Sequence, residues 1–155
     1  MPGSPAPALR YHLRLATVAD SEELFRIHRE SMTPYLREAL GEWSDEADRE
    51  QHDEWFRQGR AHVITVDERV AGCLDVVRKD GVLWLLRIEL DPQLQGRGIG
   101  SAVVTDLQAQ AAAEGLRMIL DVFSGNPARR LYERLGFRET GQDGPSIRME
   151  WQPVR

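Results

Sequence analysis

The chain has 155 residues, of which 41% are hydrophobic and 29% are charged, and its formal net charge is −5. This length and composition fit one soluble globular domain with a sizeable core. The negative charge argues against nucleic acid as a partner, because phosphate binding needs a basic face. No apolar run approaches the ~18 residues of a membrane span, so we expect no membrane partner. The single cysteine, Cys73, excludes an internal disulfide framework and fits a reducing, cytoplasmic compartment.

Residues 1–8 are rich in Pro, Ala and Gly and contain neither a basic n-region nor an apolar h-region. This composition predicts a flexible tail rather than a signal peptide. The rest of the chain, residues 9–155, shows no internal repeat and no domain boundary, so we expect one domain there. Cys73 lies in an apolar strand pattern, which favours a buried, inert thiol over a nucleophile.

The hydrophobic periodicity and the turn residues predict a regular series of elements along the chain. The predicted strands are Tyr11–Ala16, His62–Val66, Val70–Val77, Val82–Leu90, Leu116–Phe123, Phe137–Thr140 and Ile147–Trp151. The predicted helices run from a capping box at Thr17 to about Glu30, from the N-cap Thr33 to Gly41, and over Ser44–Gln58, Gly98–Glu114 and Asn126–Leu135. This order predicts an α/β fold with a mixed sheet and helices on both of its faces.

The predicted helix over residues 44–58 is dense in acidic residues and has few apolar anchors beyond Ala47, Trp55 and Phe56. We therefore expect it to be mostly solvated, loosely held and the part of the chain that moves. Its acidic surface could steer a cationic substrate. A solvated helix with ion pairs to Arg49 and Arg57 is the favoured interpretation.

A glycine-rich loop joins the apolar run Val82–Leu90 to a helix whose apolar residues recur every four positions. Asp91-Pro92 ends the strand, because proline restricts the residue before it and cannot donate to a ladder. The glycines let the backbone turn tightly and present N–H groups at a helix N-terminus, which favours an anion. The residues of this predicted phosphate cradle are Gln95, Gly96, Arg97, Gly98, Ile99, Gly100 and Ser101.

Two kinds of phosphate-binding loop compete for this segment. A dinucleotide fold requires G-x-G-x-x-G and an acidic residue roughly 20 positions later. Here Ser101 replaces the third glycine, and too few βα units follow the loop, although Asp121 lies near the acidic position. By contrast, Gln95–Gly100 resembles the Q/R-x-x-G-x-G/A signature of the GCN5-related N-acetyltransferase (GNAT) family, whose loop amides hold the coenzyme A pyrophosphate.

A second motif follows at residues 126–137, NPARRLYERLGF. Asn126 caps a helix, Pro127 fills its first position, and Gly136 takes the left-handed position after its end. From helix physics alone, Tyr132 is a core residue that packs on Phe137. The segment also resembles N-x-x-A-x-x-L-Y-x-x-L-G-F, the second acetyl-CoA motif of the GNAT family.

The resemblance implies how acetyl-CoA is held and how it reacts. In the family the asparagine, here Asn126, contacts the pantetheine arm or orders its loop, and the tyrosine, here Tyr132, protonates the departing thiolate. A phenol of pKa about 10 can share its proton with a thiolate whose parent thiol has a pKa of about 8.5, because the two values lie close together. The backbone of Ile88 and Leu90 matches the strand residues that hold the pantetheine and the acetyl carbonyl, and the N–H of Leu90 would polarise that carbonyl.

The resemblance runs from about Tyr11 to Trp151 and is specific only from Ile88 to Phe137. In the second motif, Arg129 and Arg130 either meet the adenosine 3′-phosphate or face water. The fold implied is the GNAT fold, a mostly antiparallel twisted sheet with helices on both faces.

The attacking amine is protonated at neutral pH, so a base or a water chain must take its proton. Glu89 is the first candidate, because an acid among Leu85, Leu86, Ile88 and Leu90 is out of pattern. The alternative is that Glu89 alternates outward and pairs with Arg87 or another cation. Further candidates are Asp75 on the neighbouring strand and His28 on the first helix. The four histidines show no metal-ligand spacing, so we expect no metal site.

The sequence thus predicts an acetyl-CoA-dependent N-acetyltransferase that acts directly on a primary amine of a small molecule, peptide or protein. No acyl-accepting cysteine or serine is evident, which favours direct attack. The alternative function is a catalytically silent acyl-CoA-binding sensor, and a dinucleotide-binding fragment is a further rival. Pairing of protomers through the C-terminal strands, giving a homodimer, is an additional hypothesis, since edge strands invite pairing.

Overall fold

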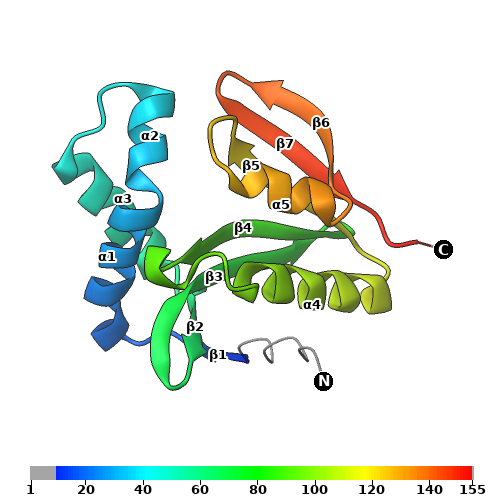
Figure 1. The fold of residues 1–155 in the computed structure, drawn as a ribbon, viewed down its shortest axis with the longest axis horizontal. Coiled ribbons are helices and arrows are strands. Elements are labelled where there is room, and N and C mark those ends of the chain that lie inside the picture. Colours follow the sequence, from blue (N-terminus) through cyan, green and yellow to red (C-terminus); the bar gives the residue numbers. More distant parts are fainter. Residues whose placement is uncertain (1–9, 155) are drawn as a thin grey trace, which may run out of the picture.

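The computed structural model describes residues 10–154, so the predicted tail at residues 1–8 lies outside the described residues. The described chain forms a seven-stranded mixed sheet in the order β1-β2-β3-β4-β5-β7-β6 (Figure 1). Its strands are β1 (Tyr11–Leu15), β2 (His62–Val66), β3 (Arg69–Lys79), β4 (Val82–Leu90), β5 (Arg117–Phe123), β6 (Arg138–Asp143) and β7 (Ser146–Trp151). All neighbouring strands are antiparallel except β4 and β5, which confirms the predicted fold class.

The sheet opens into a fork, because β4 and β5 pair over only part of their length. Their parallel ladder runs from Val82 opposite Arg117 to Leu85 opposite Leu120. Beyond it, β4 stays paired with β3 as far as Leu90, and β5 stays paired with β7 as far as Phe123. The facing edges of β4 and β5 therefore have free backbone groups inside the fork, and the two strands diverge in Figure 1.

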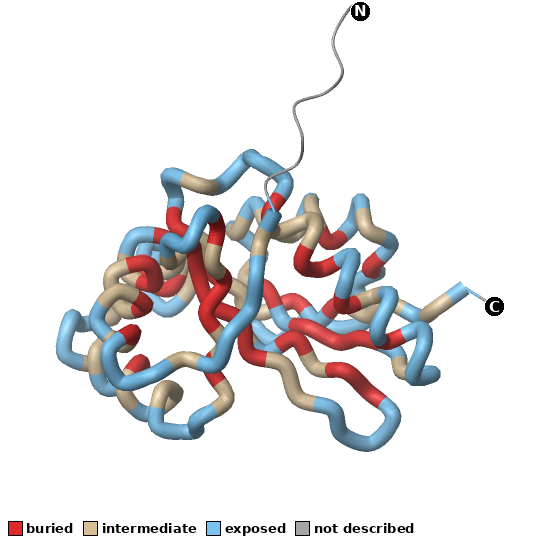
Figure 2. The backbone as a smooth tube through the Cα atoms, turned by 90° about the horizontal axis from the view of Figure 1, so that it is seen from below, coloured by how far each residue is buried: buried red, intermediate tan, exposed pale blue. Residues whose placement is uncertain are grey.

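Helices cover both faces of the sheet. They are α1 (Ser21–Ser31), α2 (Thr33–Leu40), α3 (Asp45–Arg57), α4 (Ile99–Glu114) and α5 (Ala128–Arg134), with 3₁₀ turns at Val18–Asp20 and Pro92–Leu94. The larger core cluster joins α4 and α5 to one face, through residues such as Leu83, Val103 and Tyr132. A smaller cluster, which includes Leu24 and Cys73, joins α1 and α3 to the other face. In Figure 2 the buried positions follow the strands and the inner sides of these helices.

Helix α3 is anchored to α1 by polar side chains that the sequence did not predict. Asp48 and His52 on this helix are fully buried, because their side chains find polar and aromatic partners on α1 rather than solvent. The expected ion pairs are present on its outer side, where Arg49 meets Asp53 and Arg57 meets Glu54. Polar contacts to α1 thus replace the missing apolar anchors.

The starts of the first two helices compare differently with their predictions. The capping box predicted at Thr17 is present, with the Asp20 carboxylate accepting the Thr17 N–H at 2.7 Å, but it opens a 3₁₀ turn that precedes α1. Thr33 is the first residue of α2 rather than its N-cap, and its hydroxyl donates to Asp48 Oδ2 at 2.6 Å. In contrast, Ser44 caps α3 as its polar side chain suggests, accepting the Ala47 N–H at 3.0 Å.

Candidate active site

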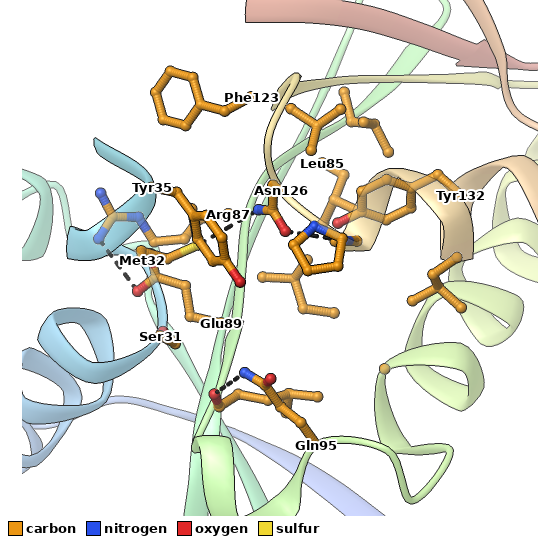
Figure 3. Close-up of a pocket in the computed structure, with 18 of the residues that line it drawn as sticks. Ser31, Met32, Tyr35, Leu85, Arg87, Glu89, Gln95, Phe123, Asn126 and Tyr132 are labelled. Atoms are coloured by element: carbon orange, nitrogen blue, oxygen red, sulfur yellow. Dashed lines mark hydrogen bonds and ion pairs between the residues drawn. The ribbon is translucent and has the colours of Figure 1, made fainter. Parts of the chain in front are cut away.

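A cavity of about 610 Å³ fills the fork between β4 and β5 (Figure 3). Both sequence motifs and the first two helices contribute to its wall. Its polar lining groups are His28, Ser31, Tyr35, Gln51, Arg87, Glu89, Gln95, Ser101, Asp121, Asn126, Tyr132, Arg134 and Ser146. A cavity of this size, with a few polar groups among apolar ones, is of the kind that binds a small molecule.

The glycine-rich loop forms one end of the cavity and leads into α4. Gly96 and Gly98 have φ of 76° and 83°, values in the left-handed region that favour glycine. Gly98 is the N-cap, and the first bond of the helix runs from the Ala102 N–H to the Gly98 carbonyl at 3.0 Å. The N–H groups of Ile99, Gly100 and Ser101 therefore have no partner within the helix, an arrangement that favours an anion.

The end of β4 presents backbone groups to the cavity. The Asp91 N–H donates to the Ala71 carbonyl at 2.8 Å, so this backbone group faces β3. Because backbone groups alternate along a strand, the N–H and carbonyl of Leu90 face the open fork instead. The Leu90 carbonyl accepts the side-chain amide of Gln95 at 3.1 Å, and the Leu90 N–H is left for another acceptor.

A β-bulge decides where the β4 side chains point. Leu85 lies opposite Val76 and Arg87 lies opposite Asp75, so Leu86 has no partner on β3. After the bulge Ile88 and Leu90 pack on the α4 side of the sheet, and Arg87 and Glu89 face α1 and α3. Figure 3 shows the side chains of Arg87 and Glu89 directed toward these helices.

Tyr132 reaches from α5 into the cavity (Figure 3). Its ring packs edge-on against Phe137, with ring centroids 5.7 Å apart. Its hydroxyl makes no hydrogen bond to any described residue, and burial raises the pKa of Tyr132 to about 12. Tyr132 thus has both predicted features, since it packs in the core and also presents an unpaired proton donor to the cavity.

A buried ionic cluster joins three elements beside the cavity. His28 on α1 lies with Nδ1 2.9 Å from Glu89 Oε2 on β4 and with Nε2 2.8 Å from Asp48 Oδ1 on α3. The exposed fractions of His28, Asp48 and Glu89 are 4%, 0% and 5%. Asp48 also accepts hydrogen bonds from the Thr33 hydroxyl at 2.6 Å and the Trp43 indole at 3.1 Å. We call His28, Asp48 and Glu89 the carboxylate–histidine clamp.

The clamp favours its charged forms. Burial would raise the pKa of Glu89, but the hydrogen bond from His28 and the charge of Arg87 hold it below its ordinary value. Burial would lower the pKa of His28, and its bonds to Glu89 and Asp48 raise it instead. Burial also opposes ionisation of Asp48, but its donors Thr33, Trp43 and His28 lower its pKa.

The model of the acetyltransferase (GNAT) family matches residues 22–137, which include the fork, the loop and Tyr132. The chain belongs to this family. It is 35% identical over 71 residues to a spermine/spermidine N(1)-acetyltransferase of Bacillus subtilis (strain 168), with 44% of this chain aligned. That alignment spans 47% of the relative, about half of its length.

Solved GNAT structures share the fold of most of this chain. The PaiA N-acetyltransferase of Thermoplasma acidophilum, in complex with coenzyme A, superposes with a TM-score of 0.73 at 18% identity, over 94% of this chain and 100% of that one. The ribosomal-protein-S18-alanine N-acetyltransferase of Escherichia coli gives a TM-score of 0.67 at 20% identity, over 92% and 94% of the two chains. At these identities the likeness shows the fold alone.

Most site residues predicted for this GNAT protein line one cavity. They are Ile88, Glu89, Leu90, Gln95, Gly96, Gly98, Ile99, Gly100, Ser101, Asn126 and Tyr132. The Asn126 side chain accepts the Ala128 N–H at 2.9 Å, but the N-cap of α5 is Pro127, so the helix begins one residue later than predicted. Two predicted residues are not part of the wall. Arg97 is exposed on the loop, and Arg129 pairs with Glu133 at 3.2 Å and with Glu139 at 2.9 Å.

The alternative bases are placed differently. Asp75 is fully buried away from the cavity wall, where Arg60 at 3.1 Å and the Trp55 indole at 2.8 Å bind its carboxylate. His28 lines the cavity behind Glu89. Cys73 is buried as expected, and burial raises the pKa of its thiol.

Three residues in or beside this cavity were not predicted from the sequence. Asp48 resembles the other acids of a solvated helix, and no local pattern distinguishes it from them. Gly72 lies within an apolar strand pattern, and an isolated glycine there is a signal for close backbone approach. Arg134 lines the cavity from within the second motif, at a position that the motif pattern leaves unspecified.

Proposed function

We propose that this protein transfers the acetyl group of acetyl-CoA directly to a primary amine. The observation that carries the proposal is the fork between β4 and β5, which joins an anion-binding loop, free β4 backbone and the unpaired Tyr132 hydroxyl in one cavity. Among residues 10–154, no helix combines the length and the apolarity needed to cross a membrane. In the same range, no group of three or more His, Cys, Asp or Glu side chains is arranged to hold a metal ion.

The residues present fit coenzyme A. The N–H groups of residues 98–101, with Gln95, Gly96 and Arg97 beside them, would hold the pyrophosphate at the α4 N-terminus. The backbone of Ile88 and Leu90 would pair with the pantetheine amides, as the edge of an open strand pairs with an extended chain. Asn126 orders the loop before α5 on the opposite wall.

Acetyl-CoA supplies the thioester for this reaction. The amine nitrogen forms a bond to the acetyl carbon, the carbon–sulfur bond breaks with its electron pair on sulfur, and an ammonium substrate releases one proton to water overall. The Leu90 N–H stabilises the charge that develops on the acetyl oxygen. Tyr132 donates its proton to the departing thiolate and regains one from the new amide nitrogen.

Glu89 is the proposed base. Its carboxylate lies in the cavity wall and is held ionised, so it can accept the first proton of the ammonium group, through a water where the contact is not direct. Asp75 is a poorer candidate. Its carboxylate is already paired with Arg60 and hydrogen-bonded to the Trp55 indole, and it does not line the cavity.

The acceptor is a primary amine of a small molecule or of a peptide. The relative from B. subtilis is named for spermine and spermidine, and the structural neighbour from E. coli is named for an alanine of a ribosomal protein. A polyamine would need carboxylates for its further charges. The acids that line the cavity are Glu89, which pairs with His28, and Asp121, which pairs with Arg148. This favours a single amine next to apolar groups.

Thermal unfolding with and without saturating acetyl-CoA tests the cofactor, with NAD as the control ligand. A ligand at 100 times its Kd adds about 2.7 kcal/mol. For a chain of this size we expect a rise in Tm of about 5–10 °C with acetyl-CoA alone. A rise with NAD alone would instead support a dinucleotide site.

An acceptor panel then tests the reaction. It should contain spermidine, an aromatic monoamine and a peptide with N-terminal alanine, each incubated with acetyl-CoA while free thiol is measured. Turnover of any of them supports the enzyme. Binding of acetyl-CoA without turnover across a broad panel would favour an acyl-CoA sensor.

A further inference from the structure

The contacts of His28 in the carboxylate–histidine clamp indicate that its ring is charged. Both ring nitrogens of His28 lie within hydrogen-bond distance of a carboxylate oxygen. A neutral imidazole has one N–H and could satisfy only one of them, whereas an imidazolium donates to both. The geometry therefore fits a cation between two anions.

A buried ionic cluster of this kind contributes little to the free energy of unfolding. Taking charges out of water costs several kcal/mol per ion, and well-packed apolar side chains of similar volume are often as good or better. The clamp also lies at the cavity, since His28 and Glu89 line it and Asp48 lies behind them on α3. Its position indicates a role in the reaction.

We propose that His28 and Asp48 are positioning residues that hold the Glu89 carboxylate ionised and fixed at the cavity wall, where it receives the proton of the acceptor amine. The inference rests on the proposed function and extends it to α1 and α3. Asp48 accepts the hydrogen bond from the second N–H of His28. Through this contact α3 takes part in catalysis by way of His28. No proton needs to pass along the clamp, because Glu89 returns its proton to water in the cavity.

The surroundings of Glu89 explain why it needs the clamp. From β3 it faces the Cys73 thiol, with Sγ 3.8 Å from Oε1, and from β4 it faces Arg87, with Nη1 also 3.8 Å away. Arg87 is directed over the Trp55 ring, 4.1 Å from its centroid, and its Nη1 forms no hydrogen bond with any described residue. His28 therefore provides the close hydrogen bond that keeps this buried carboxylate ionised.

The cations around Asp48 and the second buried histidine complete the electrostatic environment. On α1, Arg29 Nη1 lies 4.0 Å from Asp48 Oδ2, and on α3, His52 lowers the pKa of Glu89 only when His52 itself is protonated. Burial lowers the pKa of His52, so His52 is neutral near pH 7 and adds no fixed charge there. Removal of the His28 charge would thus leave Glu89 with Arg87 alone.

The test is the pH dependence of kcat/KM for one amine, compared among wild type and the variants His28→Gln and Asp48→Asn. Asp45→Asn is the matched control, because it makes the same change on the same helix at an exposed carboxylate that pairs with Arg29 and Arg37. The titration of the amine itself is common to all four proteins. Loss of a nearby charge shifts a carboxyl pKa by about 1–3 units.

We expect the acidic limb of the profile to move up by about 1–3 pH units in His28→Gln and by less in Asp48→Asn. On the alkaline plateau both variants should approach the wild-type rate, and Asp45→Asn should follow wild type throughout. An equal loss of rate at every pH, with an unmoved limb, would overturn the inference. Wild-type activity in Glu89→Gln would overturn it as well.

An NMR titration of the His28 ring in the wild-type protein gives a readout that needs neither a variant nor an acceptor. Both ring N–H groups should persist at pH 7, and a neutral ring at that pH would overturn the charged clamp. If no amine is acetylated although acetyl-CoA binds, the proposed function fails, and the NMR result still decides the charge state of the clamp.

Discussion

Gly72 on β3 lies directly against the backbone carbonyl of Glu89 on β4. A Cβ atom at Gly72 would lie 2.0 Å from that oxygen and 3.0 Å from Leu90 Cδ2, well inside van der Waals contact. Gly72 is also the register partner of Leu90, the last residue of β4. The absence of a side chain at residue 72 therefore sets how closely the end of β4 that lines the cavity approaches β3.

Gly72→Ala should displace this end of β4. We expect a loss of about 1–3 kcal/mol in the free energy of unfolding, as for other overpacked sites. Acetyl-CoA binding should weaken as well, because the Leu90 N–H and carbonyl move with the strand. Urea unfolding and calorimetric titration of acetyl-CoA measure the two effects.

Gly141→Ala is the control for Gly72→Ala, since it makes the same change on β6 at a site where a Cβ meets nothing within 4 Å. It should leave both stability and affinity close to wild type. If Gly72→Ala binds acetyl-CoA as tightly as Gly141→Ala does, the position of the β4 end is not important for the cofactor.

Tyr132→Phe removes the proposed acid with little cost to the fold. The Tyr132 hydroxyl makes no hydrogen bond to a described residue, and a phenylalanine keeps the ring contact with Phe137. We expect kcat to fall about 10²–10⁴-fold, the usual contribution of an acid–base group. The KM for acetyl-CoA and the Tm should change little. An unchanged kcat would assign Tyr132 to the core alone.

The glycine-rich loop and the motif at residues 126–137 could be predicted from sequence, because neighbouring residues in the chain determine the backbone geometry of each. Turn glycines, a helix N-terminus and a capped helix are local features, so Gly98 and Asn126 predict their own backbone geometry. The clamp could not be predicted in this way. Its contacts join residues 61 and 20 positions apart, on three elements whose packing no local pattern specifies.

The direction of the Glu89 side chain illustrates the same limit. Simple alternation along Val82–Leu90 would place Glu89 on the same face as Leu83 and Leu85. The bulge at Leu86 shifts the alternation by one residue, so Glu89 faces α1 instead. A bulge depends on the partner strand, and the sequence of β4 alone does not contain it.

The two buried histidines should give stability opposite dependences on pH. Burial opposes protonation of both, but bonds to Glu89 and Asp48 raise the pKa of His28, whereas nothing comparable offsets burial at His52. The His28 contribution is therefore full below the unfolded pKa of about 6.5 and is lost as pH rises through the raised folded pKa. The His52 contribution is full above about 6.5 and is lost as pH falls through the lowered folded pKa.

Urea unfolding of wild type, His28→Gln and His52→Gln between pH 5 and 9 separates these effects. The stability lost in His28→Gln should be largest at acidic pH and should shrink as pH rises. The stability lost in His52→Gln should be largest above pH 7 and should shrink as pH falls. Each unit of pKa difference corresponds to about 1.4 kcal/mol. Parallel curves for all three proteins would contradict both assignments.

Arg134 is a better candidate than Arg129 for the cofactor phosphates. The guanidinium of Arg129 is matched by Glu133 and Glu139 outside the cavity, while Arg134 lines the cavity and forms no ion pair among residues 10–154. A phosphate gains most from a cation that is not already neutralised, and a hydrogen bond to a charged group contributes about 1.5–3 kcal/mol. Arg134→Ala should therefore raise the Kd of acetyl-CoA about 10-fold or more. Arg129→Ala should change it little.

The comparison of acetyl-CoA with its 3′-dephospho form shows which phosphate is bound. If Arg134 meets the 3′-phosphate, the wild-type preference for acetyl-CoA should disappear in Arg134→Ala, because the dephospho form lacks the group that this arginine binds. If Arg134 meets the pyrophosphate, both ligands should weaken equally. A loss of affinity in Arg129→Ala but not in Arg134→Ala would instead assign phosphate binding to Arg129, one of the two arginines that the sequence motif suggested. Arg129 would then have to break its ion pairs with Glu133 and Glu139 when the cofactor binds.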